Sequence, residues 1–451
     1  MRTTAVILAA GQGTRMRSAL PKVLHPLLGR PLIQYSVDAA QSATGHRPVV
    51  VIGHGGEAVR QAVGEAADYV LQEPQLGTGH AVQQAESILR GQTDQVLIIT
   101  ADMPLLRGET LSALVQVQQA HSGPISMLTI VTDDPRGFGR VLRDPGGQAQ
   151  AVIEEAQASP EQLAIRELNA SVYCIAADWL WKALKRIPLS PKGEYYLTDL
   201  VGIAVADGYP VRTQAIQDPS ETIGINNRIH LAEAAAVLRQ RINQAWMLAG
   251  VTLVDPNTTY IEFEVSIGQD TTIWPNSYLQ GNTRIGAGCS LGPNTIVRDT
   301  QIGDRCQVLA SVLEKALLED DVEIGPFGHL RKGAHLAQGV HLGNFGEVKN
   351  SYLGPGTKMG HFSYIGDANI GPDVNIGAGT ITCNFSLEGK KNPTEIGRGA
   401  FIGSDTMLVA PLKIGEGAAT GSGSVVTKNV PDHTLVVGVP ARAIRKLEKR
   451  D

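Results

Sequence analysis

The first residues with chemical potential form a glycine-containing segment near the start of the chain, Leu8-Ala-Ala-Gly-Gln-Gly-Thr-Arg-Met16, with Pro21-Lys22 shortly after it. Glycines allow a backbone to approach a ligand closely, and the N–H groups of a tight turn bind phosphate oxygens. Arg15 and Lys22 add positive charge beside this turn, which can balance the charge of a phosphate chain. The segment predicts a site for a phosphate chain, with a merely tight turn as the alternative.

Two basic residues in the last third of the chain have a spacing that favours an anion site. Arg331 and Lys349 are eighteen residues apart. If three six-residue strands make one turn of a coil, these side chains lie on the same face of adjacent turns, about 4.8 Å apart. Two stacked cations would bind an anion such as a sugar phosphate. A solvated basic face is the alternative.

The first half of the chain alternates strand-like and helix-like segments, which would position the glycine segment. Short apolar runs rich in β-branched residues are typical of buried parallel strands, and runs with apolar residues every three or four positions are typical of helices. The predicted strands cover 3–10, 48–53, 95–100 and 125–131, and two predicted helices cover 32–43 and 79–90. The alternation predicts a doubly wound, Rossmann-like α/β domain with its active site at the carboxyl ends of the strands.

The chain changes character near its middle. Helix-forming residues with an apolar stripe predict a helix over 227–249, which Gly250 would end. After it, an aliphatic residue followed by glycine recurs about every six residues, as at Ile396, Ile402 and Ile414. This period fits neither a helix nor a hairpin and is typical of a parallel β-helix. The predicted domains are therefore 1–226, a linker helix over 227–249 that equally serves as the last helix of the first domain, and 250–451.

With a predicted strand before it, the glycine segment resembles the LAAGxGTRM…PK signature of the sugar-nucleotide pyrophosphorylases. The resemblance continues through 72–78 and through Thr100-Ala-Asp102-Met-Pro104. It departs at Gln12, where the family often has Lys, and at Thr100 and Ala101. It implies that a sugar 1-phosphate oxygen attacks the α-phosphorus of a nucleoside triphosphate and displaces pyrophosphate, with Mg²⁺ and cationic side chains stabilising charge.

The same resemblance implies roles for individual residues. Mg²⁺ is expected to bind Asp102 and Asn226, and Arg15 and Lys22 are expected to act in catalysis. UTP and the UDP-sugar are expected to contact Leu8, Ala9, Ala10, Gly11, Lys22, Gln72, Gly77, Thr78, Gly139, Glu154, Asn169 and Asn226. A further family match, Gly-Glu-Tyr-Tyr-Leu-Thr-Asp at 193–199, has no chemical step assigned to it.

The second half resembles the hexapeptide-repeat acyltransferases through the runs 343–349, 360–368 and 375–384, and this implies a left-handed β-helix. Together the two halves resemble the bifunctional enzymes that join a glucosamine-1-phosphate acetyltransferase to an N-acetylglucosamine-1-phosphate uridylyltransferase. The expected substrates are glucosamine 1-phosphate, acetyl-CoA, N-acetylglucosamine 1-phosphate and UTP, and the expected product is UDP-N-acetylglucosamine. The resemblance also implies a homotrimer with acetyl-transfer sites between neighbouring β-helices.

Within the β-helix, His361 is expected to remove the proton of the substrate amine, because histidine titrates in the useful pH range. A structural histidine at a repeat corner is the alternative. The amino-sugar phosphate is expected to bind Arg331, Lys349, Tyr364 and Asn375, and acetyl-CoA is expected to contact Ala378, Asn384, Phe385, Ser404 and Ser422. Phe385 stands where the family commonly has Tyr, and Ser422 where it commonly has Ala.

Three other functions remain open from the sequence. The β-helix is alternatively a non-catalytic assembly module of a single-activity sugar-1-phosphate nucleotidylyltransferase, or part of a purely structural or regulatory protein. Hexapeptide β-helices also include zinc-dependent hydratases, and His329, His335, His341 and His361 lie in one region. His335 and His341 are six residues apart and point from different faces of one coil. Three histidine ligands would therefore have to meet across subunits.

The composition argues against several broad classes of protein. With 43% apolar residues the chain can bury ordinary cores, and its net charge of −5 does not favour a general nucleic-acid binder. No run approaches the roughly 18 apolar residues that span a membrane. The four cysteines are scattered without a CxxC pair, which argues against a disulfide scaffold or a structural zinc site. The start lacks signal-peptide features, so we expect a cytoplasmic protein that binds neither nucleic acid nor membrane.

Overall fold

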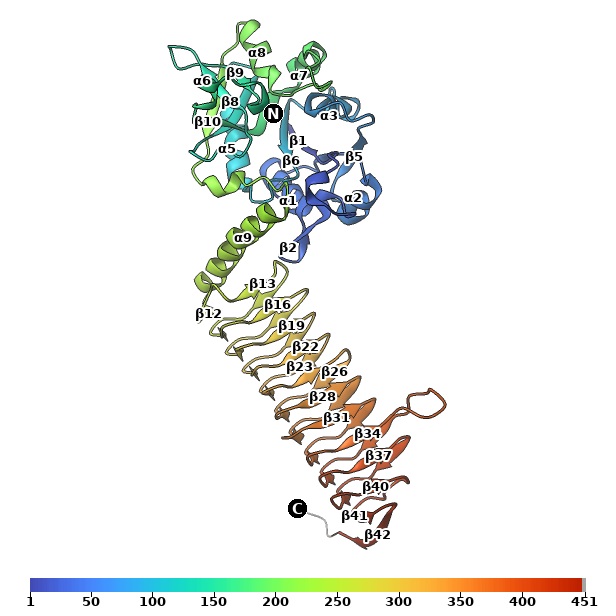
Figure 1. Ribbon diagram of the computed structural model, residues 1–451. Coiled ribbons are helices and arrows are strands. Elements are labelled where there is room, and N and C mark those ends of the chain that lie inside the picture. Colours follow the sequence, from blue (N-terminus) through green and yellow to red (C-terminus); the bar gives the residue numbers. More distant parts are fainter. Residues whose placement is uncertain (448–451) are drawn as a thin grey trace. The chain divides into compact units, whose positions relative to one another are not determined.

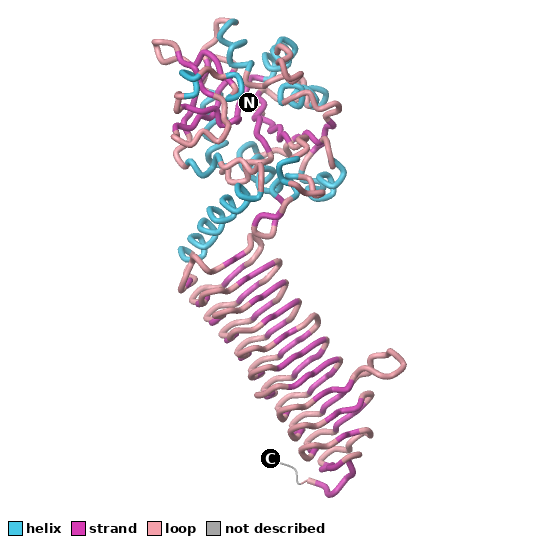
Figure 2. Tube along the Cα trace, viewed as in Figure 1, coloured by secondary structure: helices cyan, strands magenta, loops and turns pink. Residues whose placement is uncertain are grey.

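The computed structural model describes residues 1–447, and the chain divides into two compact units, Met1–Leu238 and a second unit from Arg239 onward. Figure 1 labels many of the elements of both units. In Figure 2 the first unit mixes helices with strands, whereas the second is a stack of short strands joined by turns. The predicted domain boundaries after 226 and 249 stay a prediction, because the division into units falls inside a helix.

The first unit is built on a mixed sheet with the strand order β11-β7-β10-β6-β1-β4-β5. β4, β1 and β6 pair in parallel, whereas β10 runs antiparallel to both β6 and β7. These strands are β1 (Thr3–Leu8), β4 (Val49–Ile52), β5 (Asp68–Leu71), β6 (Gln95–Thr100), β7 (Ile125–Val131), β10 (Glu167–Ala176) and β11 (Val211–Ala215).

The strand predicted over 125–131 is β7, and it lies in a sheet that is mixed rather than wholly parallel. After β7 the chain forms the hairpin of β8 (Arg140–Arg143) and β9 (Ala149–Ile153) and returns as β10 beside β7. Strands that follow each other without a crossover helix pair antiparallel. β10 therefore separates β7 from β6.

Helices cover both faces of this sheet, because successive residues of a strand point to opposite sides. Val6 and Ile98 belong to one core with the helices α3, α4, α7 and α8, while Ile7 and Ile99 belong to another with α1, α2 and α5. The helices are α1 (Leu32–Thr44), α2 (Gly56–Val63), α3 (Thr78–Gln84), α4 (Glu86–Leu89), α5 (Gly108–Gln119), α6 (Pro160–Leu163), α7 (Ala177–Ala183) and α8 (Asp199–Ala206). The predicted doubly wound α/β fold is confirmed.

The second unit is a parallel β-helix with three sheets, in which every third strand as far as β40 belongs to the same sheet, and the last strand, β42, pairs antiparallel with β41. The first sheet holds β12 (Thr252–Leu253), β15 (Thr272–Ile273), β18 (Ser290–Leu291), β21 (Gln307–Val308), β24 (Glu323–Ile324), β27 (His341–Leu342), β30 (Lys358–Met359), β33 (Asn375–Ile376), β36 (Phe401–Ile402), β39 (Ala419–Thr420), β41 (Thr434–Gly438) and β42 (Ala441–Lys446). The second holds β13 (Tyr260–Ile261), β16 (Tyr278–Gln280), β19 (Ile296–Arg298), β22 (Val312–Glu314), β25 (His329–Leu330), β28 (Gly346–Lys349), β31 (Ser363–Gly366), β34 (Ile381–Cys383), β37 (Met407–Val409) and β40 (Val425–Val426). The third holds β14 (Ser266–Ile267), β17 (Arg284–Ile285), β20 (Gln301–Ile302), β23 (Leu317–Leu318), β26 (Ala334–Leu336), β29 (Ser351–Leu353), β32 (Ala368–Ile370), β35 (Thr394–Ile396) and β38 (Leu412–Ile414).

The repeat explains this coil. Most of the short strands bury at least one aliphatic residue, and these residues stack in register, as Ile273, Leu291 and Val308 do on three successive coils. The stacked aliphatic side chains form a single core that runs through the unit. The predicted parallel β-helix is confirmed.

The helix α9 (Arg228–Leu248) contains the boundary between the units. Asn227 caps its start, because its Oδ1 accepts a first-turn N–H at 2.9 Å. In its second half Asn243 is buried and donates through Nδ2 to the carbonyl oxygens of Pro256 and Thr259, at 2.8 and 3.0 Å. These bonds fix the end of α9 to the first coil. None of the helices within residues 1–447 is long and apolar enough to cross a membrane.

Candidate active sites

A cleft of about 660 Å³ lies at the carboxyl ends of the central strands of the first unit. From β1 the sheet extends through β4 and β5 on one side and through β6 on the other. The strand order therefore reverses between β1 and β6, and open α/β sheets bind their ligands at such a switch point. The segments that follow β1 and β6 both line the cleft.

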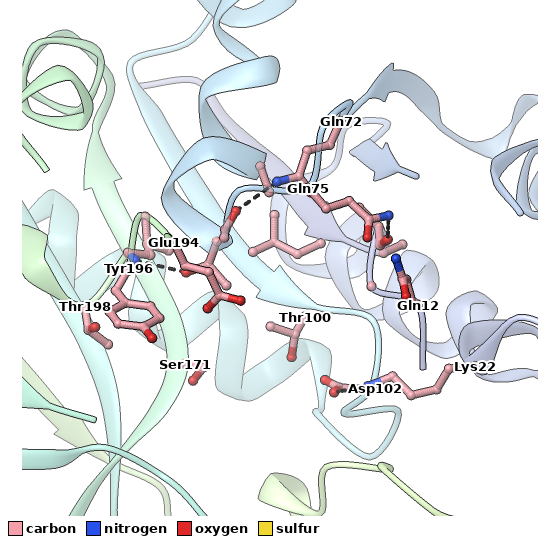
Figure 3. A pocket seen from close by; sticks show the side chains of 18 of the residues that line it. Gln12, Lys22, Gln72, Gln75, Thr100, Asp102, Ser171, Glu194, Tyr196 and Thr198 are labelled. Atoms are coloured by element: carbon pink, nitrogen blue, oxygen red, sulfur yellow. Dashed lines mark hydrogen bonds and ion pairs between the residues drawn. The ribbon is translucent and has the colours of Figure 1, made fainter. Parts of the chain in front are cut away.

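Most of the residues expected to bind nucleotide or metal lie along this cleft. They are Leu8, Ala9, Ala10, Gly11, Lys22, Gln72, Gly77, Thr78, Asp102 and Glu154. Figure 3 shows Lys22 and Asp102 pointing toward each other, with Glu194, Tyr196 and Thr198 on the opposite side. The cleft therefore has one strongly charged wall and one wall of mixed polar and aromatic groups.

The glycine loop is packed directly on Lys22. Gly13 has φ 63°, a left-handed conformation that L side chains rarely adopt, and a Cβ added there would lie 2.5 Å from the Cβ of Lys22. On the other side of the loop, Gln75 Nε2 donates to the carbonyl of Ala10 at 2.6 Å. Glycine is needed at 13 both for its backbone conformation and for this close approach.

Lys22 is the centre of a charged cluster. Its Nζ lies 2.7 Å from Asp102 Oδ2 and 3.4 Å from Asn226 Oδ1, and Arg15 donates to the same Asn226 oxygen at 2.9 Å. Lys22 begins the short helix η2 (Lys22–Leu24), Asp102 follows β6 and Asn226 precedes α9. Burial alone would raise the pKa of Asp102, but the Lys22 ammonium holds that pKa below its ordinary value.

The arrangement of these oxygens fits a magnesium ion. The two predicted metal ligands, Asp102 and Asn226, both direct an oxygen at the Lys22 ammonium group. This group occupies a position between the two oxygens that a metal ion could take. Carboxylate and amide oxygens are ligands that Mg²⁺ prefers. Mg²⁺ usually takes only one or two carboxylate or other protein ligands and completes its shell with phosphate and water.

Two of the expected sugar-binding residues lie outside the lining of the cleft. Gly139 is followed by the first residue of β8, and Asn169 is buried within β10. Asn169 Nδ2 donates to the hydroxyl of Tyr173 at 2.7 Å, and its Oδ1 accepts the N–H of Ser171 at 3.1 Å. Contact of Gly139 and Asn169 with the sugar stays a prediction.

A smaller cavity of about 140 Å³ adjoins the cleft and is lined by Asn226. Thr100, Asp102 and Ser171 line both spaces. Ser171 has φ 56° where the pairing of β10 with β7 shifts register, and this turns the residue toward the site. Sequence reasoning missed Ser171, because a bulge inside a strand leaves no periodic signal.

The run 193–199 supplies part of the opposite wall. Glu194, Tyr196 and Thr198 line the cleft, and Thr198 Oγ1 donates to Glu154 Oε1 at 2.9 Å. The sequence singled out this run only as a family match. Its position explains why it accompanies the glycine loop: Thr198 orients a residue that was predicted to bind the sugar.

In the second unit Arg331 and Lys349 lie at equivalent positions on adjacent coils, since β25 and β28 pair in parallel register up to these residues. Lys391, which sequence reasoning did not select, extends the cluster from the loop 384–394 that leaves the coil in Figure 1. Contact with Lys391, and then the charge of Arg331, lowers the pKa of Lys349 below the ordinary value for lysine. Three cations that repel one another favour an anionic ligand.

Four of the expected acetyl-transfer residues form a second column at another corner. Each is the second residue after a strand of the first sheet, on four successive coils: His361, Ala378, Ser404 and Ser422. Tyr364 lies on β31 of the second sheet, between this column and Lys349, while Asn375 begins β33 of the first sheet. The second sheet therefore separates the His361 column from the cationic cluster within one chain.

The last two expected acetyl-CoA residues lie where the loop 384–394 leaves the coil. Asn384 is buried and donates through Nδ2 to Asp367 Oδ2 at 2.6 Å. Phe385 is exposed and pairs through its backbone with Lys391. Asp367 also lies 3.8 Å from the Lys391 ammonium. These contacts connect the predicted residues to the cationic cluster.

The histidines considered as zinc ligands do not converge. His329, His335 and His341 lie on β25, β26 and β27, which belong to three different sheets. Each faces a glutamate of the preceding coil, at 3.5 Å for His329 with Glu314, 2.8 Å for His335 with Glu319 and 3.1 Å for His341 with Glu323. Among residues 1–447 no three His, Cys, Asp or Glu side chains are placed to hold a metal ion. A zinc site would still require a second subunit.

Comparisons with known proteins agree with both halves. Residues 5–185 match the MobA-like NTP transferase domain, residues 264–299 match the bacterial transferase hexapeptide repeat, and residues 393–428 match the hexapeptide repeat of succinyl-transferase. The predicted combination of an α/β nucleotidyltransferase domain with a left-handed hexapeptide β-helix is thereby confirmed.

Similar proteins carry both halves in one chain. The chain is 47% identical to a "Bifunctional protein GlmU" of Heliobacterium modesticaldum, over 97% of this chain and 95% of the relative. It is 46% identical to the protein of the same name from Trichlorobacter lovleyi, over 100% and 99%, and 45% identical to that from Pelobacter propionicus, over 96% and 95%. The predicted relation to bifunctional enzymes is confirmed, and the chain belongs to the family of bifunctional GlmU proteins.

Proposed function

We propose that this chain makes UDP-N-acetylglucosamine in two steps, one in each unit. The β-helix transfers an acetyl group from acetyl-CoA to glucosamine 1-phosphate. The α/β unit then transfers a uridylyl group from UTP to N-acetylglucosamine 1-phosphate and releases pyrophosphate. Membership of a bifunctional family over nearly the whole chain supports this over a single activity with a β-helix used for assembly. The observation that carries the uridylyl step is the cluster of Lys22, Asp102 and Asn226 beside the cleft.

In the uridylyl step the chain binds and orients its substrates and needs no covalent nucleophile. The glycine loop and Lys22 hold the phosphate chain, the segment 72–78 contacts the nucleoside, and Glu154 holds the sugar. Arg15 and Lys22 stabilise charge that develops as the sugar-phosphate oxygen attacks and pyrophosphate leaves. When held by Asp102 and Asn226, Mg²⁺ supplies further positive charge at the phosphates.

In the acetyl step the substrate nitrogen attacks the thioester carbonyl, the C–S bond breaks and CoA leaves as the thiol. His361 accepts the proton that the amine loses, and this proton passes to the leaving CoA sulfur. Arg331 and Lys349 bind the sugar phosphate together with Tyr364 and Asn375. Lys391 also binds this phosphate, because it contacts Lys349 in the same cationic cluster. Acetyl-CoA contacts the column above His361 and the base of the loop 384–394.

A homotrimer would complete this second site. Lys349 is level with Gly366, five residues from His361 along the coil, which corresponds to about 16 Å of extended chain. Because His361 and Lys349 lie at opposite ends of the strands of the second sheet, we propose that a neighbouring chain contributes residues to the site. We also propose a cytoplasmic location, where UTP and acetyl-CoA are supplied.

The decisive experiment measures CoA release from acetyl-CoA with glucosamine 1-phosphate in the absence of UTP. Release that requires this amino sugar and falls about a hundredfold or more in His361→Ala supports acetyl transfer by the β-helix. The matched control is His341→Ala, which removes a histidine from β27, the strand of the first sheet one coil before His361. No release from a folded protein that still makes UDP-N-acetylglucosamine would leave the β-helix as an assembly module.

A further inference from the structure

We propose that Lys22 is a resident counter-ion that keeps Asp102 and Asn226 closed to divalent cations until a phosphate ligand takes its ammonium group. The inference rests on the proposed metal site and concerns how that site is controlled. It begins from a single atom: Lys22 Nζ contacts the oxygen of each predicted metal ligand, at 2.7 and 3.4 Å. The ammonium thus stands at the point where these two oxygens converge.

The ammonium and a metal ion exclude each other at this point. Mg²⁺ binds its oxygen ligands at about 2.0–2.1 Å. The ammonium and the metal would therefore be adjacent cations competing for the same oxygens, in a place where water screens them poorly. The side chains of Lys22 and Asp102 are only 15% and 24% exposed. A divalent ion must displace Lys22 from Asp102 before it binds.

The fold allows the Lys22 ammonium group to contact a phosphate at the glycine loop instead of Asp102. Its stem is held by the glycine loop, which has no Cβ at Gly13 and packs against the Lys22 Cβ. The rest of the side chain lines the cleft together with Gly11. A phosphate chain bound at the loop would thus lie within reach of the ammonium while the lysine backbone stays in place. The phosphate that attracts Lys22 also supplies the remaining metal ligands, so nucleotide and metal enter together.

Arg15 separates the effect of contacting Asn226 from the effect of the ion pair with Asp102. It also lies at the site, but it contacts Asn226 at 2.9 Å and makes no ion pair with Asp102 within residues 1–447. Displacement predicts that Lys22 hinders metal binding much more than Arg15 does. A general repulsion between cations predicts similar effects for the two residues, both reduced by salt.

The test measures Mn²⁺ binding by electron paramagnetic resonance on the full chain without nucleotide. Lys22→Met keeps the length of the side chain and removes its charge, and we expect it to bind Mn²⁺ about tenfold more tightly than the unchanged protein. Lys22→Arg is expected to bind as weakly as the unchanged protein. Arg15→Met and the distant Lys182→Met are expected to change the affinity by less than about threefold.

The outcomes separate this inference from the proposed metal site. Asp102→Asn combined with Lys22→Met should abolish the gained Mn²⁺ binding. If the gain survives that double substitution, the metal is bound elsewhere and the proposed ligand pair is wrong. If Lys22→Met gains nothing, or no more than Arg15→Met, while Asp102→Asn still weakens Mn²⁺ binding, the metal site stands and the counter-ion role of Lys22 is overturned. Circular dichroism of each variant verifies that it is folded.

Discussion

In the first unit, side chains from segments far apart in the sequence meet in one cleft, whereas in the second unit the candidate residues follow one another up the coils at nearly fixed intervals. Arg15, Lys22, Asp102 and Asn226 come together because strand ends meet at a switch point. Arg331 and Lys349 come together because each coil places its strand on the one before.

This difference changes what each unit needs from its surroundings. The cleft buries part of its charge and neutralises it internally, through the pair of Lys22 with Asp102. The β-helix displays Arg331, Lys349 and Lys391 on its surface, where Glu347 lies 2.8 Å from Arg331 and Asp367 lies 3.8 Å from Lys391, yet the net effect of the cluster still lowers the pKa of Lys349. The first candidate site therefore lies in a cleft of one unit, whereas we propose that a neighbouring chain completes the second.

The largest difference between the two activities is expected from Asp102→Asn. Removing the carboxylate should lower uridylyl transfer by about a thousandfold or more, because a metal ion that offsets several kcal/mol of transition-state charge is lost. Acetyl transfer should persist, since Asp102 and its partner Lys22 both belong to the first unit. Both rates are measured separately on the same preparation. Loss of both activities in a folded protein would contradict separate sites.

A smaller and more selective effect is expected in the β-helix from Lys349→Ala. Losing one charge-assisted contact to the sugar phosphate should raise the KM for glucosamine 1-phosphate by about tenfold or more. Uridylyl transfer should remain as before. Lys358→Ala, on a strand of the first sheet, is the matched control. An unchanged KM would reject the assignment of Lys349.

The close packing of the glycine loop predicts a moderate effect from Gly13→Ala. Gly13 and Gly45 both have left-handed φ angles, 63° and 69°, but only Gly13 has an atom within 4 Å of an added Cβ. Both substitutions strain the backbone by about 1 kcal/mol or more. Only Gly13→Ala should also displace Lys22 and lower uridylyl transfer, by about tenfold. Thermal unfolding and initial rates measure the two effects, and equal rates in the two variants would argue against the close approach.

The smallest expected effect compares one ion pair in each unit. Arg143 holds Glu167 at 2.7 and 2.6 Å in the first unit, and Arg305 holds Asp321 at 2.7 and 2.9 Å in the second. Hydrogen bonds from the arginine lower the pKa of each carboxyl group. A lowered folded-state pKa stabilises the protein fully above the ordinary value, which is 4.5 for Glu167, and this stabilisation is lost as the pH falls through the lower folded-state pKa.

Glu167→Gln should therefore cost about 1 kcal/mol or less in the free energy of unfolding at pH 7, because the pair is partly exposed. The difference from the unchanged protein should shrink as the pH falls below 4.5. Asp321→Asn should have a smaller effect at every pH, because that pair is on the surface. Urea unfolding at pH 7 and in acid measures both. If the difference in unfolding free energy between Glu167→Gln and the unchanged protein grows in acid, the pKa of Glu167 is raised on folding and not lowered.

The sequence predicted most of the elements that carry the site, for reasons that act locally. Apolar runs gave the strands β1, β4, β6 and β7, and the six-residue period gave the β-helix with Arg331 and Lys349 in register. It failed for β10, whose antiparallel course depends on a hairpin before it. It also missed Ser171 and Lys391, which reach their places through a bulge and a loop rather than through a repeat.

The sequence by itself determined the two fold classes, the glycine loop and the spacing of the stacked cations. These features depend on residues that are close together in the sequence, so a local pattern is enough to identify them. Only the tertiary structure decided that Lys22 occupies the point where Asp102 and Asn226 converge, and that the second sheet separates His361 from the cationic cluster. These two arrangements depend on which strand ends lie side by side in the first unit and on which turns of the β-helix stack on one another. Such meetings are set by sheet order and coil register, which bring together residues that no local pattern connects.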